Sequence, residues 1–347
     1  MTDKQWEKLK NILTGKETVQ GTTGFIIDSP WLPGWNNLTK LQYYTSDDLW
    51  YQTNKKAIEA FPDTFFLPWF WSEYGMCTEP SAFGAKLSWH EDSLPWAGKI
   101  IPDIQDINTL EIPDPKTDGL LPFMIQRLKN TEEDIRALGH RIRFAVARGP
   151  LNIASYLRGT TELMTDFMMY PGETSTFLDK ITHFTIQWLQ YQKEQFPSIE
   201  GIMILDDLIG FVGEQEFISF VLPRLKEIFG AFDAGVRLLH NDAQGLITAR
   251  YLSEMNVNIF NFSHEHSLNE IRDLAGPEVI LLGNLPPRDV LAAGTPETVA
   301  RETEKMMRET KDQTGIIWSC GGGMPPEVST ENIQAFIETV KRVSDER

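Results

Sequence analysis

The chain has 347 residues, which suits one large barrel or two ordinary domains, and 41% of them are hydrophobic, enough for a sizeable core. A formal charge of -17 argues against nucleic acids and anionic membranes as main partners. The two cysteines are too few for a disulfide framework, and no apolar run approaches the roughly 20 residues that span a bilayer. The first residues lack the apolar core of a signal peptide. We therefore expect a cytoplasmic protein.

The predicted elements begin with an amphipathic N-terminal helix in residues 1–20, with Asp3 as its N-cap and Gly15 as its stop. Apolar runs that end abruptly at polar, Gly or Pro residues then predict eight strands. These are residues 24–28, 64–68, 142–147, 201–206, 235–240, 258–263, 279–284 and 315–320. Helical patterns separate most of them, which implies parallel βαβ units and a closed (β/α)8 TIM barrel.

Two long segments interrupt this alternation. Residues 29–63 are rich in Trp, Tyr, Asn and Asp, and residues 69–121 carry many Pro and Gly and a predicted hairpin near Gly84 to Trp96. We expect both insertions to cover the barrel mouth, where the strands end. No repeat or linker divides the chain, so we predict a single domain over residues 1–347.

Three potential metal ligands lie at strand ends in the last third of the chain. His240 and Asp242 are two residues apart, so in extended backbone both can face the barrel axis, and Cys320 ends the eighth strand. An imidazole, a carboxylate and a thiolate would leave one position open on zinc, as in catalytic sites. Alternatively, His240 is a hydrogen-bonded core histidine and Cys320 a small buried hydrophobe.

Three further residues are candidates for catalysis. Asp206 ends the fourth strand beside Asp207, and Glu73 follows the second strand at the mouth. A carboxylate there could act as a general base or ligate metal, or it could cap a helix or form a salt bridge. We expect His264, after the sixth strand, to act beside the metal or on substrate, and His266 to be exposed.

Aromatic residues and one arginine are candidates for substrate binding. Trp31, Trp35 and Trp71 follow the first two strands and could stack on a flat ligand, or they could fill the mouth or a homodimer interface. Arg148 follows the third strand and could bind an anionic ligand or pair with one of the many carboxylates. The chain has no P-loop, G-x-G-x-x-G, G-x-S-x-G or H-E-x-x-H motif, which disfavours common nucleotide, hydrolase and metalloprotease functions.

Over about residues 20–345, the sequence resembles the uroporphyrinogen decarboxylase superfamily. The matching segments are 149–157 (GPLNIASYL), 206–207 (DD), 282–287 (LGNLPP) with 294–297 (GTPE), and 321–327 (GGGMPPE) with 331–333 (ENI). Decarboxylases of this superfamily carry an arginine-rich segment after the first strand, where this chain reads DSPWLPG, and a closing histidine, which falls at Gly322. A porphyrinogen with eight carboxylates needs cationic partners, so this difference disfavours that substrate.

The sequence also resembles the other branch of the superfamily, the corrinoid-linked methyltransferases, whose members bind zinc through a histidine and two cysteines. His240 matches their histidine, Asp242 stands where they have a cysteine, and Cys320 lies near their last cysteine. The resemblance implies a zinc-dependent methyltransferase that moves a methyl group from a small methoxylated aromatic substrate to the corrinoid of a partner protein. The carboxylate makes the donor set harder and suits an oxygen-bearing substrate. The alternatives are a carboxy-lyase of the decarboxylase type and a non-catalytic barrel that binds a tetrapyrrole or corrinoid.

Overall fold

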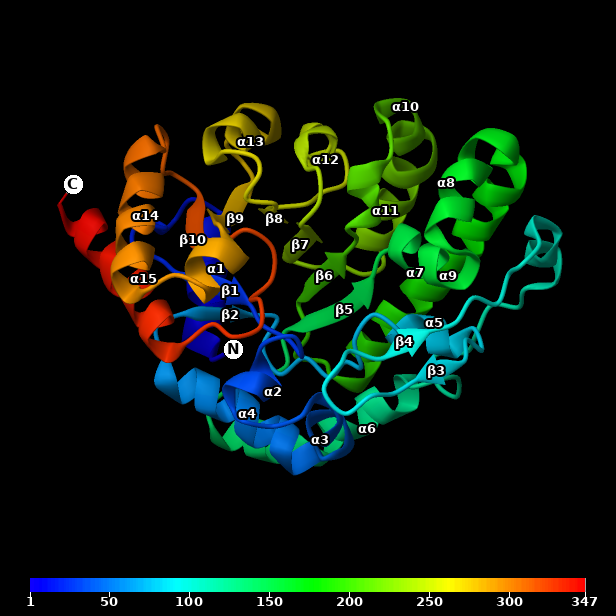
Figure 1. The fold of residues 1–347 in the computed structure, drawn as a ribbon, viewed down its shortest axis with the longest axis horizontal. Helices are drawn as coiled ribbons and strands as arrows, with labels where there is room; N and C mark the ends of the chain where they lie inside the picture. The colour runs from blue at the N-terminus through cyan, green and yellow to red at the C-terminus, as the bar shows by residue number, and fades with distance from the viewer. Residues whose placement is uncertain (347) are drawn as a thin grey trace.

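The computed structural model describes residues 1–346 and contains all eight predicted strands, each within two residues of its predicted bounds (Figure 1). They are β1 (Gly24–Ile26), β2 (Phe65–Leu67), β5 (Phe144–Arg148), β6 (Gly201–Leu205), β7 (Val236–Asn241), β8 (Ile259–Phe262), β9 (Ile280–Leu285) and β10 (Ile316–Cys320). The predicted hairpin is also present, as β3 (Leu87–Ser88) and β4 (Trp96–Ala97). The apolar runs therefore located the strands correctly.

The strands form a parallel sheet of six, in the order β10-β9-β8-β7-β6-β5, and a parallel pair of β1 and β2. A bridge between Thr23 and Trp318 joins the pair to β10. The α/β class and the parallel sheet are confirmed, whereas the predicted closed barrel is met only in part. Within residues 1–346, no ladder joins β2 to β5.

A side chain satisfies the edge of β5 where a strand would otherwise pair. The Val146 N–H donates to Gln192 Oε1 at 3.0 Å, and Gln192 Nε2 donates to the Val146 carbonyl at 3.0 Å. An unpaired strand edge buried in a protein must find such partners. Gln192 therefore explains why this seam needs no backbone ladder.

Helices follow the strands and cover the outside of the sheet (Figure 1). The α-helices are α1 (Asp3–Leu13), α2 (Leu32–Trp35), α3 (Lys40–Thr45), α4 (Asp47–Ala60), α5 (Thr78–Ala82), α6 (Leu121–Ala137), α7 (Pro150–Arg158), α8 (Thr160–Met169), α9 (Pro171–Gln195), α10 (Glu214–Glu216), α11 (Leu222–Phe229), α12 (Leu246–Arg250), α13 (Leu268–Ala275), α14 (Pro296–Glu309) and α15 (Thr330–Asp345). Short 3-10 or π segments are η1 (Ile104–Thr109), η2 (Leu208–Phe211), η3 (Phe217–Val221) and η4 (Pro287–Ala292). Among residues 1–346, no helix is long and apolar enough to cross a membrane.

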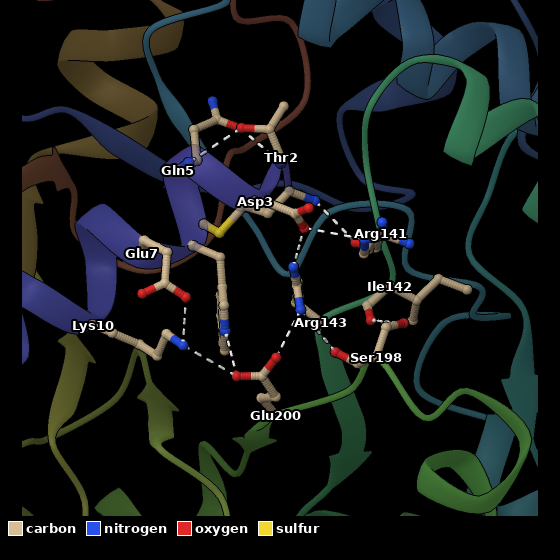
Figure 2. Close-up of polar contacts among 12 residues, drawn as sticks. Thr2, Asp3, Gln5, Glu7, Lys10, Arg141, Ile142, Arg143, Ser198 and Glu200 are labelled. Carbon is tan, nitrogen blue, oxygen red and sulfur yellow. Dashed lines mark hydrogen bonds and ion pairs between the residues drawn. The ribbon is translucent and has the colours of Figure 1, made fainter.

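The first helix packs under the amino ends of β5 and β6. Thr2 caps α1 in a capping box with Gln5, so the predicted cap Asp3 is wrong by one residue. The Asp3 carboxylate instead binds Arg141 at 3.1 Å and also Arg143, which in turn pairs with Glu200 at 2.8 Å (Figure 2). These ion pairs tie α1 to the sheet, at the end opposite the strand ends that carry the candidate site.

Strand register determines which side chains face the inside of the ring. One row of paired positions runs Arg148, Leu205, His240, Asn261, Leu282 and Ile317. Paired residues of parallel strands point to the same face, and the next residue points to the other. Asn241, next to His240, donates to Thr248 of the covering helix α12 at 3.3 Å, so the row itself faces inward.

Candidate metal centre and substrate site

Three side chains converge where β6 and β7 end. One ligand atom each from Asp207, His240 and Asp242 lies within 4.8 Å of the others. His240 Nε2 lies 3.5 Å from Asp207 Oδ1, and the same oxygen accepts the Asp242 N–H at 3.1 Å. The predicted pair of His240 and Asp242 is thus brought together, with Asp207 as the third member.

Asn261 fixes the orientation of the His240 ring. Its Nδ2 donates to the Leu282 carbonyl at 2.8 Å, so its Oδ1 faces His240 Nδ1, at 2.6 Å. A carbonyl oxygen can only accept, so the proton of a neutral His240 lies on Nδ1 and the Nε2 lone pair faces the two carboxylates. A histidine that binds a metal needs this tautomer, with its other nitrogen held by an outer partner.

The two carboxylates of the triad repel one another. Partial burial raises the pKa of Asp242, and the negative charge of Asp207 raises it further. The neighbouring His240 opposes this rise. A divalent cation would remove this repulsion and use one nitrogen and two oxygens as ligands, a donor set that zinc accepts. The residues present therefore fit a metal ion.

Cys320 does not join the triad, and Asp207 takes the place that the sequence assigned to it. Ile317 lies in the inward row, so Cys320, three residues later, points to the opposite face. Its Sγ lies 3.8 Å from the carbonyls of Gly322 and Gly323, and burial raises the pKa of the thiol to about 12. Its contacts match the alternative of a small buried side chain.

Asp206 and Glu73 hold backbone amides. Asp206 accepts the N–H groups of Leu151 and Asn152, at 2.9 and 3.1 Å, at the start of α7. Burial raises the pKa of Asp206 to about 8 despite these bonds. Glu73 accepts the N–H of Ser29 at 3.1 Å and that of Gly75, so it links the loops after β1 and β2. Catalytic roles for both stay predictions, and the contacts observed are those of the helix-cap alternative for Asp206.

The two histidines after β8 exchange their expected environments. His264 is exposed beside the β10 loop, where a Cβ added at Gly321 would meet its backbone N. His266 is buried, contrary to the prediction, and its Nε2 has no hydrogen-bond partner within residues 1–346. It turns inward because its carbonyl binds the Asn284 side chain and its ring packs near Gly245. The role of His264 stays a prediction.

Trp31 and Trp35 have the contacts expected of packing residues, and their assignment to substrate binding stays a prediction. Their rings stack at a centroid distance of 4.9 Å. Trp31 Nε1 donates to the Val328 carbonyl and Trp35 Nε1 to Thr330 Oγ1, each at 3.0 Å. Both indole donors are used in joining α2 to the start of α15, so the packing alternative describes them.

Trp71 and Arg148 form a pair at the mouth. The Arg148 guanidinium lies 4.8 Å from the centroid of the Trp71 ring, and both side chains are buried. The Arg148 backbone N–H donates to Glu79 Oε1 at 2.9 Å, which fixes the residue at the end of β5. A flat cation on an aromatic face is a pre-formed surface for a planar or anionic group.

Sequence reasoning missed three residues of the site besides Asp207. Asn261 lay inside a predicted strand, and only the register with His240 reveals it. Asp28 follows Ile26 by two residues, so strand alternation could have placed it inward; burial and the charge of Glu73 raise its pKa to about 8. Burial also raises the pKa of Tyr156, while the Arg148 charge lowers it. The Tyr156 hydroxyl is therefore close enough to Arg148 to respond to its charge.

Known proteins resemble this chain in sequence. The sequence profile of the family described as Uroporphyrinogen decarboxylase (URO-D) matches residues 38–343. Uroporphyrinogen decarboxylases from Trichlorobacter lovleyi and Syntrophotalea carbinolica are each 24% identical over 246 residues; the matches cover 69% of this chain and 70% and 69% of the relatives.

Solved structures share the fold. A methyltransferase from Methanosarcina mazei superimposes with a TM-score of 0.80 at 17% identity, covering 96% of this chain and 97% of the other. A B12-independent methionine synthase from Shewanella gives a TM-score of 0.51 at 11% identity, covering 94% of this chain and 96% of the other. At these identities the similarity concerns the fold alone.

Proposed function

Because this chain belongs to the uroporphyrinogen decarboxylase family, we propose that it is a methyltransferase of that family, which moves a methyl group from a small methoxylated aromatic compound to a corrinoid on a partner protein. The observation that carries the proposal is the triad of Asp207, His240 and Asp242. Decarboxylation of a porphyrinogen with eight carboxylates needs a cluster of cations. Among residues 1–346, the arginines that we find near the candidate site are the buried Arg148 and the exposed Arg288, whose charge lowers the pKa of Asp242. The fold shared with a methyltransferase supports the proposal.

Asp207, His240 and Asp242 would hold the metal, which we propose to be zinc. A zinc ion bound there would supply a Lewis acid that polarises an ether oxygen as its methyl group leaves. Asn261 keeps the Nε2 lone pair of His240 directed at the carboxylates. The same contacts restrict rotation of the ring, so the site is organised before any ligand binds.

The remaining residues would orient the substrate and manage a proton. The Trp71 ring, with Arg148 on its face, offers a surface for an aromatic ring. Asp28, two residues after β1, has its pKa raised to about 8 by burial and the Glu73 charge, which favours its protonated form. It is therefore suited to donate a hydrogen bond or a proton to an oxygen at the mouth.

A carboxy-lyase remains the alternative, because two relatives that match over two thirds of this chain are uroporphyrinogen decarboxylases. Metal dependence separates the two functions, because the decarboxylase alternative needs no cofactor. The third alternative, a non-catalytic tetrapyrrole- or corrinoid-binding barrel, predicts no turnover at all.

The test is a methyl-transfer assay with reduced cobalamin as acceptor and a panel of methoxybenzenes as donors. We expect about one zinc per chain, activity that a chelator removes and zinc restores, and loss of both in His240→Ala and Asp207→Ala. Cys320→Ala is the matched control and should retain metal and activity. Protein with far less than one zinc per chain, unaffected by added zinc, would contradict the proposal.

A further inference from the structure

Arg148 differs from every other buried arginine in the described chain. Five arginines are buried, and four of them pair with a carboxylate. The pairs are Arg127 with Asp47, Arg143 with Asp3 and Glu200, Arg158 with Asp166, and Arg224 with Asp179. The Arg148 guanidinium has no ion pair or hydrogen bond within residues 1–346, and it lies over the Trp71 ring. A buried charge without a partner is costly, so an unpaired arginine calls for an explanation.

The contrast is sharpest beside β5 itself. At the amino end of this strand, Arg143 is 7% exposed and is bound by two carboxylates (Figure 2). At the carboxyl end, Arg148 is 6% exposed and has none. The chain therefore has the means to neutralise a buried arginine on this strand and does so only at the end away from the candidate site.

The acidic neighbours of Arg148 do not supply the missing charge. Glu79 binds the backbone N–H of Arg148 rather than its guanidinium, and burial raises the pKa of Glu79. Burial raises the pKa of Asp28 to about 8 and the Arg148 charge opposes the rise, but within residues 1–346 no ion pair joins the two side chains. The side-chain nitrogens of Arg148 are not completely buried, so their N–H groups remain accessible to a ligand.

The position of Arg148 relative to the triad sets the shape of its ligand. Arg148, Leu205 and His240 are paired positions on three successive strands, so their side chains share the inward face. Two strand spacings put the backbones of Arg148 and His240 roughly 10 Å apart. A single aromatic ligand with one polar substituent toward each residue could therefore contact both side chains.

We propose that Arg148 binds a carboxylate carried by the substrate, so that the substrate class is a methoxylated aromatic carboxylate. The inference that the other end carries a methoxy group rests on the proposed function, whereas the carboxylate end rests on Arg148 alone. The guanidinium matches a carboxylate with two parallel N–H···O bonds, and the anion would neutralise the one buried arginine that the protein leaves unpaired.

The experiment measures binding of 3- and 4-methoxybenzoate and of the corresponding neutral methoxybenzamides to the zinc-treated full chain by calorimetry. We expect the wild type to bind the better acid about tenfold to a hundredfold more tightly than its amide, the range for a hydrogen bond to a charged group. Arg148→Met should abolish the preference, and Arg148→Lys should keep part of it. Arg141→Met, an exposed arginine before the same strand, should leave it unchanged, with thermal melts to confirm folding.

The outcomes separate this inference from the proposed function. The proposed binding of a carboxylate by Arg148 is overturned if wild type and Arg148→Met prefer the acid equally. It is also overturned if the wild type shows no preference for the acid at millimolar probe concentrations. Equal methyl transfer from acid and amide also overturns it and leaves the methyltransferase intact. An Arg148-dependent preference without methyl transfer from any probe keeps the anion site and removes the proposed function.

Discussion

Asn261→Leu should weaken zinc binding without unfolding the protein. Leucine has nearly the size of asparagine but cannot accept the Nδ1 proton of His240, which the native amide does at 2.6 Å. The ring then loses both its tautomer preference and its restraint, and the Leu282 carbonyl loses its donor at 2.8 Å. Partners of metal-binding histidines are typically worth about 10- to 100-fold in metal affinity, which corresponds to about 1.4 to 2.8 kcal/mol.

The assay is a zinc titration against a competing chelator dye, run beside urea unfolding. Asn258→Leu is the matched control: Asn258 precedes the same strand, where its Oδ1 accepts the Arg237 N–H at 2.7 Å and its Nδ2 donates to Gly235 at 2.9 Å. This control should lose stability and keep zinc affinity. Asn261→Asp, which retains an acceptor, should bind zinc more tightly than Asn261→Leu. A folded Asn261→Leu protein with wild-type affinity would refute the role of the amide.

Other substitutions test the remaining contacts. Asp28 binds its proton more tightly in the folded protein, where its pKa is about 8, than in the unfolded chain. The free energy of unfolding should therefore fall as pH rises from about 4 to 8. Asp28→Asn should melt at a higher temperature than wild type at about pH 8, and the difference should be smaller at about pH 5. Cys320→Ala should cost on the order of 1 kcal/mol of stability and no metal, checked by unfolding and metal analysis. Trp31→Ala should cost about 3–5 kcal/mol and leave zinc affinity unchanged. Gly322→Ala should weaken zinc binding, since its Cβ would lie 2.9 Å from that of Asp242 at a φ of +78°.

The sequence predicted most of the fold because buried parallel strands are short, apolar and sharply ended. Each of the eight runs produced a strand, and the helix cap was missed by a single residue because Thr2 and Asp3 are both good caps. The open seam between β2 and β5 was not predictable, because the Gln192 side chain that satisfies it lies on a helix far along the chain.

The sequence predicted two of the three residues of the triad, and it did not reveal contacts that depend on distant strands. His240 and Asp242 came from spacing within one strand, which sequence reveals directly. The choice between Asp206 and Asp207 depends on register with β7, and the direction of Cys320 depends on register with β9. The packing contacts of Trp31 and Trp35 were not predictable because their partners, Val328 and Thr330, lie almost 300 residues away in the sequence.

A crystal of zinc-treated protein, measured on both sides of the zinc absorption edge, tests the central claim most directly. We predict one anomalous peak at the mouth, about 2.0–2.2 Å from His240 Nε2 and from carboxylate oxygens of Asp207 and Asp242, with His240 Nδ1 still on Asn261. A peak bound by Cys320 in place of Asp207, or the absence of a peak beside His240, would contradict the account.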